Sequence, residues 1–135
     1  MTIYVPDDLA GEVKEFPAIN VSGVCQRALR SELGWRRAVT STDDMERQTV
    51  YTEAMGDLAF IGRLLTTIDP PGDGPVAVYL TKRHRIAVYN DSHQTLDDYD
   101  TFADLANAPF GAFGPLMLSD VASALGVEHV TELDI

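Results

Sequence analysis

The opening of this chain is too small to fold alone, which constrains it more than any other feature. Residues 2–5 alternate between polar and apolar side chains and are followed by Pro6, which predicts a very short strand. Two amphipathic helices are expected next, one ended by Pro17 and one running from a cap at Asn20 or Ser22 to a C-cap at Gly34. Such elements bury too little apolar surface for a monomer. We therefore expect two copies to pair their strands across a two-fold axis.

The expected dimer core is formed by the apolar residues that share one face of each element. It comprises Ile3, Val5, Leu9, Val13, Val24, Cys25, Ala28 and Leu29. Cys25, the single cysteine, is expected to act as a small buried hydrophobe. One cysteine excludes an intrachain disulfide framework and fits a reducing cytoplasm, so we expect a cytoplasmic protein.

The order strand, Pro6-Asp7-Asp8-Leu9, helix, Asn20-Val21-Ser22, helix resembles the ribbon-helix-helix DNA-binding domains of the MetJ/Arc/CopG-like class. The run Cys25-Gln26-Arg27-Ala28-Leu29 is similar to small antitoxin-like members of that class. The resemblance implies a homodimer whose paired strands enter the major groove of a double-stranded DNA operator. Thr2 and Tyr4, on the outer face of the strand, would then contact base edges. A ribbon that dimerises without reading bases stays open as an alternative.

Positive groups near the second helix are candidates for contacts with DNA phosphates. The helix start presents backbone N–H groups and the positive end of the helix dipole at Val21, Ser22 and Gly23. The arginines off the apolar stripe could clamp phosphates or pair with nearby acids, and they are Arg27, Arg30, Arg36 and Arg37. A further basic cluster is expected at a hairpin tip, either solvated or as a secondary contact, and comprises Lys82, Arg83 and Arg85.

Charge divides the chain into two parts. The net charge is −11, yet residues 1–40 hold five acids and five bases, so residues 41–135 carry the whole excess. An acidic body repels DNA at long range, but it permits specific docking if it points away from the duplex. We therefore expect a DNA-binding and dimerisation module at 1–40 and an acidic domain at 46–135.

The second domain is expected to be a small, mainly antiparallel α+β unit. Strands are predicted at 48–52 and 58–68, although the second could be helical, and 76–80 with 85–89 are predicted as a hairpin. A further strand is expected at 94–99, helices at 102–105 and 116–125, with Gly126 stopping the latter, and a closing strand at 127–133. The fold class is thus α+β, with an N-terminal ribbon-helix-helix module.

The acidic domain also resembles a known family. Gly62-Arg63-Leu64-Leu65, Val78-Tyr79-Leu80-Thr81, Ala124-Leu125-Gly126-Val127 and the terminal Leu133-Asp134-Ile135 are similar to the EXLDI proteins, a bacterial family named for its C-terminal sequence. Thr131 stands where that motif has its first Glu. This resemblance implies an architecture and no established activity.

Catalytic patterns are not found, so we do not expect an enzyme, a cofactor or a metal site. His84, His93 and His129 have no metal-ligand spacing, and the acidic run at 97–100 is expected to be a solvated turn rather than a calcium loop. No apolar run reaches membrane-spanning length.

Two functions follow. The first is a sequence-specific transcriptional regulator, a repressor, whose acidic domain senses a ligand, binds a partner or assembles dimers into a higher assembly. The second is an acidic dimeric adaptor or antitoxin that binds a protein partner through its C-terminal domain.

Overall fold

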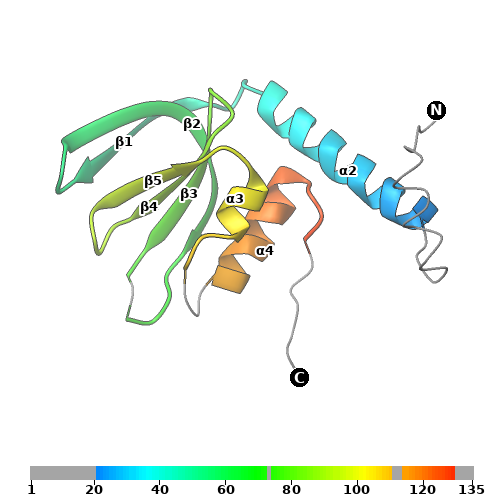
Figure 1. Cartoon of the computed structure of the whole chain (residues 1–135). Coiled ribbons are helices and arrows are strands. Elements are labelled where there is room, and N and C mark those ends of the chain that lie inside the picture. The colour runs from blue at the N-terminus through cyan, green and yellow to red at the C-terminus, as the bar shows by residue number, and fades with distance from the viewer. Residues whose placement is uncertain (1–20, 73, 111–113, 130–135) are drawn as a thin grey trace.

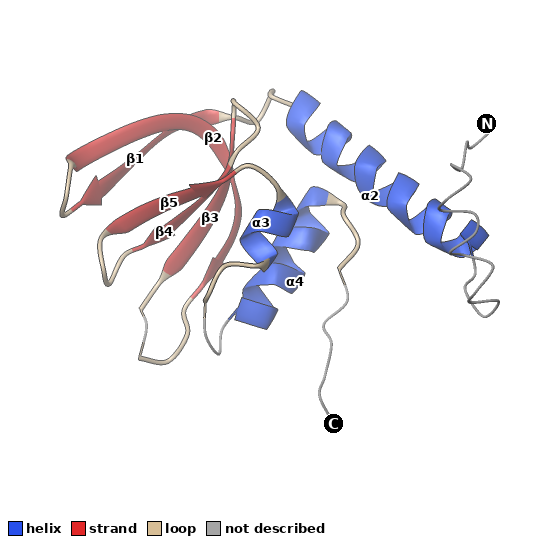
Figure 2. Ribbon diagram, in the orientation of Figure 1, coloured by secondary structure: helices blue, strands red, loops and turns tan. Residues whose placement is uncertain are grey.

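The computed structural model describes residues 21–72, 74–110 and 114–129. Within these ranges the fold is α+β, with a five-stranded antiparallel sheet and three helices (Figures 1 and 2). The elements in chain order are α2 (Val21–Thr40), β1 (Glu46–Thr52), β2 (Gly56–Ile68), β3 (Val76–Thr81), β4 (Ile86–Asn90), β5 (Thr95–Tyr99), α3 (Phe102–Ala106) and α4 (Gly114–Leu125). None of these helices is long and apolar enough to cross a lipid bilayer.

The sheet is a simple meander in which each strand pairs with the next along the chain. The predicted strands at 48–52 and 58–68 are confirmed, and the helical alternative for 58–68 is wrong because that segment pairs with both β1 and β3. The predicted hairpin is also confirmed as β3 and β4, and so is the strand predicted at 94–99. In β3 the side chains alternate between buried and partly buried, as expected of a strand covered on one face.

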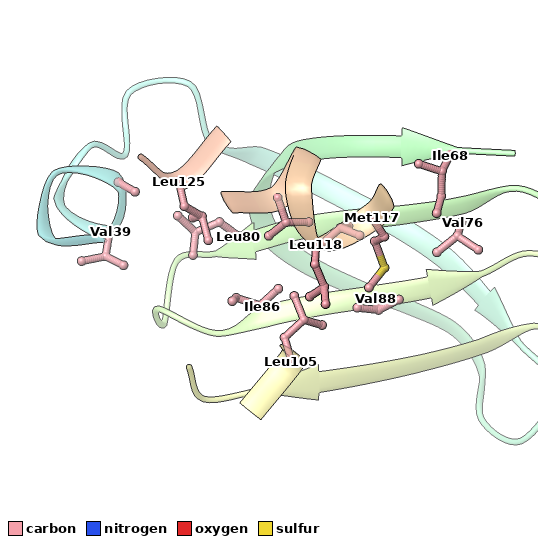
Figure 3. Close-up of a cluster of buried hydrophobic side chains, with 13 residues drawn as sticks. Val39, Ile68, Val76, Leu80, Ile86, Val88, Leu105, Met117, Leu118 and Leu125 are labelled. Atoms are coloured by element: carbon pink, nitrogen blue, oxygen red, sulfur yellow. The ribbon is translucent and has the colours of Figure 1, made fainter. Parts of the chain in front are cut away.

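One face of the sheet is covered by α3 and α4, and the main core lies between them (Figure 3). Met117 and Leu125 of α4 and Leu105 of α3 meet strand residues such as Leu80 and Ile86, all of them almost completely buried. The predicted helices at 102–105 and 116–125 are therefore confirmed. Thr101 caps the first of them, because its hydroxyl accepts a hydrogen bond from the Asp104 N–H at 3.1 Å.

The sheet is strongly curved, so that strands distant in its order approach each other. The Tyr89 hydroxyl of β4 donates to the Tyr51 carbonyl of β1 at 2.7 Å, although β2 and β3 separate these strands. The Glu53 N–H likewise donates to the Gln94 carbonyl at 3.2 Å, which joins the β1–β2 turn to the β4–β5 turn. The curvature explains why Thr52 is buried at the end of an edge strand.

The end of α2 differs from the prediction. Gly34 is expected from the sequence to terminate the helix, but α2 continues to Thr40 and contributes Ala38 and Val39 to the core (Figure 3). Gly34 instead lies against Gly126, where a Cβ on residue 34 would come within 1.8 Å of the Gly126 carbonyl oxygen. The glycine therefore permits close packing of α2 on the end of α4, which no local pattern indicates.

The closing strand predicted at 127–133 is wrong for residues 127–129, and its remainder lies outside the described residues. Gly126 ends α4 as expected, with a φ of 71°, and the Val127 N–H donates back to the Ala122 carbonyl at 3.0 Å. The Glu128 N–H donates to the Ser31 hydroxyl of α2 at 2.8 Å. With these donors engaged, the segment ties α4 to α2 instead of extending the sheet.

Candidate functional site

Helix α2 carries most of the predicted site residues that the structure describes. Its second half packs on α4, while its N-terminal end projects away from the sheet (Figure 1). Val21, Ser22 and Gly23 form the first turn at that projecting end. The predicted base-contacting residues Thr2 and Tyr4, and the predicted dimer-core residues Ile3, Val5, Leu9 and Val13, lie outside the described residues.

The apolar stripe of α2 lies at the surface of the single chain. Val24, Leu29 and Leu33 are 48%, 38% and 50% exposed. Ala28 is also exposed, and Cys25 is half-buried. Amphipathic helices normally bury this face against another element. The part of the predicted dimer core that α2 supplies is thus available to a further segment or a second copy.

The arginines of α2 make it a basic helix on an acidic protein. Four arginines and one glutamate give residues 21–40 a formal charge of +3, against −11 for the whole chain. Arg36 is paired with Glu32 at 2.7 Å. Arg27, Arg30 and Arg37 are exposed and have no ion pair with any residue in the described ranges. These three cations are therefore free to meet a negative partner.

The arginines do not all lie together. α2 has 20 residues and is about 30 Å long at a rise of 1.5 Å per residue. Arg27 is near the projecting end, whereas Arg37 is in the last turn. Arg30 and Arg37 line a groove between α2 and the end of α4, together with Arg63 of β2. The predicted phosphate contacts thus divide between the start of α2 and this groove.

The predicted secondary basic cluster at the β3–β4 hairpin is only partly available. Lys82 and Arg83 are exposed and have no ion pair with residues that the structure describes. Arg85 instead pairs with Asp98 and Asp100, and its hydrogen bond to Asp98 is the main reason that its pKa is raised. Asp97, Asp98 and Asp100 are exposed as expected, but the turn predicted at 97–100 is wrong for residues 97–99, because they belong to β5. The pairing with Arg85 joins this strand to the hairpin.

The remaining polar groups do not assemble into a metal centre within the described residues. His84 is at the hairpin tip, His93 is in the β4–β5 turn, and His129 packs edge-on against Phe102. No three described His, Cys, Asp or Glu side chains are placed to hold one metal ion.

Tyr99 lines a hollow of about 310 Å³ together with His93. The pKa of the Tyr99 phenol is raised, chiefly by burial and secondarily by the negative charges of Asp97 and Asp98.

Arg63 is not predicted from the sequence as a site residue, yet it lines the same groove as Arg30 and Arg37. It is the one arginine or lysine in the apolar segment 58–68, and this is the signal that could have found it. Its guanidinium fastens β2 to the end of α2, since it donates to the Ala38 and Ser41 carbonyls at 3.0 Å each.

No protein-family model, curated protein or solved structure matches this chain.

Proposed function

We propose that the protein is a homodimeric, sequence-specific DNA-binding regulator, a repressor, with an N-terminal ribbon-helix-helix module. The observation that carries the proposal is the character of α2, which is basic, bears an exposed apolar stripe and projects from an otherwise acidic body. Such a helix needs both an apolar partner and a negative one. A second copy would supply the first, and a duplex would supply the second.

The apolar side of α2 supports the dimer. Exposed Leu29 and half-buried Cys25 are part of the core expected when two ribbon-helix-helix chains interlock. A two-fold axis would bury this stripe against the same residues of the partner subunit and against the paired strands. Fully burying one leucine side chain contributes about 1.5–3 kcal/mol, and Val24, Leu29 and Leu33 are 38–50% exposed, so each contributes only part of that value and the paired strands supply the rest of the dimer's stability.

The projecting end of α2 supports the DNA contact. In the proposed complex, Thr2 and Tyr4 read base edges, while the first turn of α2 and Arg27 contact the backbone phosphates. The acidic domain contacts α2 at Ser31, whose hydroxyl accepts a hydrogen bond from the Glu128 N–H, so the first turn lies ten residues, or about 15 Å, beyond that contact. At that distance, roughly two Debye lengths in physiological salt, the repulsion between the acidic domain and the duplex is reduced by screening.

The test is an electrophoretic mobility shift on the DNA upstream of the protein's own gene, titrated with salt. Tyr4→Ala is expected to weaken specific binding by about 1–3 kcal/mol, or roughly 5- to 150-fold, because it removes a base contact. Tyr51→Ala is the matched control, since Tyr51 is half exposed on β1 of the acidic domain. It should leave the shift unchanged. Absence of binding by the native protein at low salt would overturn the proposal.

A second function, an acidic adaptor or antitoxin, is favoured by one observation. The sixteen acids of residues 41–135 exceed the five bases there, which suits a basic protein partner. It would be distinguished by a stable dimer that binds no DNA at low salt but binds a basic protein in a salt-sensitive way.

A further inference from the structure

A groove lined by positive side chains lies between the middle and end of α2 and the C-terminal end of α4. It has a volume of about 590 Å³. Arg30 and Arg37 line it from α2, Arg63 from β2, and Ser123 from α4. No acidic side chain lines it. In a protein with a net charge of −11, three arginines around one hollow are a marked local reversal of charge.

Two of these cations are not used within the described structure. Arg30 and Arg37 are seven residues apart on α2 and therefore lie on the same side of the helix. Both are exposed, and neither has an ion pair with a described residue. Arg36, their neighbour on another side of the helix, is neutralised by Glu32 at 2.7 Å. The groove thus gathers the unpaired arginines of this part of α2.

The third cation, Arg63, is held rigidly and gives the groove a fixed wall. Its side chain is 16% exposed, and it donates to the Ala38 carbonyl, the Ser41 carbonyl and the Asp44 carboxylate at 3.0, 3.0 and 3.1 Å. Two of these acceptors are carbonyls at the end of α2, whose negative dipole end is thereby offset. The charge that remains in the groove is positive, because Arg30 and Arg37 are uncompensated.

We propose that this groove binds a small phosphate-bearing anion, separate from any operator DNA. Guanidinium groups present forked pairs of N–H donors that match phosphate oxygens. Arg30 and Arg37 are about 10 Å apart along the helix axis, a span that two long side chains close around one diphosphate group. The hollow contains no aromatic side chain on which a nucleobase could stack, so recognition is directed at the phosphates.

The free anion is preferred over the DNA backbone because of where the groove lies. It is formed by the middle and end of α2, by Arg63 of β2 and by α4, not by the first turn of α2. A hollow within one chain fits a compact ligand, and Gly34 and Gly126, which are in contact, both line it, so the groove depends on the packing of α2 on α4.

The experiment is isothermal titration of the full chain with pyrophosphate, without DNA. Pyrophosphate is expected to bind the native protein, and Arg37→Gln or Arg30→Gln should weaken that binding by about tenfold, because each removes a charge-assisted hydrogen bond. Arg36→Gln is the matched control, with the same helix and the same change of charge, and it should bind as the native protein does. Equal thermal unfolding of the unliganded variants would show that each remains folded.

Failure to bind pyrophosphate at millimolar concentration would overturn the proposal, as would an equal loss in Arg36→Gln, which would indicate general charge attraction. In a second arm a short duplex replaces pyrophosphate. If Arg37→Gln weakens duplex binding as strongly as it weakens pyrophosphate binding, the groove serves the DNA backbone and the separate anion site is wrong. Because the first arm contains no DNA, its result is independent of the mobility shift that tests the regulator.

Discussion

At the scale of single residues, Gly34 shows how a position is decided by a distant partner. An added Cβ would lie 1.8 Å from the carbonyl oxygen and 2.5 Å from the carbonyl carbon of Gly126, both of them backbone atoms that cannot rotate away. In an isolated helix, replacing glycine by alanine stabilises by about 1 kcal/mol. Here the contact between α2 and α4 should reverse the sign.

We expect Gly34→Ala to lower the free energy of unfolding by about 1–3 kcal/mol, because α2 must move away from the end of α4. Urea denaturation followed by circular dichroism measures this. Gln26→Ala, at an exposed position of the same helix, should change the stability by no more than about 0.5 kcal/mol. A more stable Gly34→Ala protein would show that the two helices do not touch at this point.

At the scale of elements, α4 is the helix that packs most of its buried side chains against the sheet. Its side chains change from buried to exposed within one residue, since Met117 is fully buried over the sheet and Leu116 is 62% exposed. The two residues have similar apolar side chains and the same backbone conformation. They therefore separate the contribution of packing from that of helix propensity.

Met117→Ala should destabilise the protein by about 2–5 kcal/mol, through lost burial and the cavity left behind. Leu116→Ala should change the stability by no more than about 0.5 kcal/mol, because the leucine side chain is mostly in water already. The midpoints of chemical unfolding compare them directly. Similar losses in both variants would mean that α4 does not pack on the sheet through Met117.

Elements with a local signal were predictable, and contacts between distant elements were not. The hairpin of β3 and β4 follows from apolar runs on both sides of the polar tip at 82–84, and Gly126 is a helix stop that the sequence marks. The end of α2 was missed because Gly34 is a local stop signal, while its actual role depends on Gly126. The strand expected at 127–133 does not form over residues 127–129, because the N–H groups of Val127 and Glu128 bond to Ala122 and Ser31, contacts that no local pattern indicates.

At the scale of the whole molecule, charge separation was predictable and the groove was not. Counting acids and bases assigns the negative charge to residues 41–135. Nothing in the order of residues brings Arg63 of β2 beside Arg30 and Arg37 of α2, because that juxtaposition arises only when α2 packs on α4 and its end meets β2. The exposed apolar stripe and the unpaired arginines of α2 indicate that this helix binds a partner.

If the partner is a second copy that buries the apolar stripe of α2, the dimer can be tested on the intact chain. Leu29 of α2 and Leu64 of β2 are 38% and 49% exposed, so leucine-to-lysine substitution at either site introduces one charge at a comparably open position. Leu29→Lys should dissociate the dimer, because two-fold symmetry buries the new charge twice. Because Leu29 is 38% exposed, the lost apolar burial is about 0.6–1.1 kcal/mol per leucine, or roughly 1–2 kcal/mol per dimer, which weakens dimerisation by roughly 5- to 30-fold before the cost of burying two charges is added.

Sedimentation equilibrium at micromolar concentration measures the change, and the mobility shift should disappear together with the dimer. Leu64→Lys should remain dimeric and bind DNA as the native protein does. A monomeric native protein, or a Leu29→Lys variant that dimerises normally, would contradict both the dimer and the DNA-binding function built on it. The reason is that a single ribbon strand has no partner with which to enter the major groove.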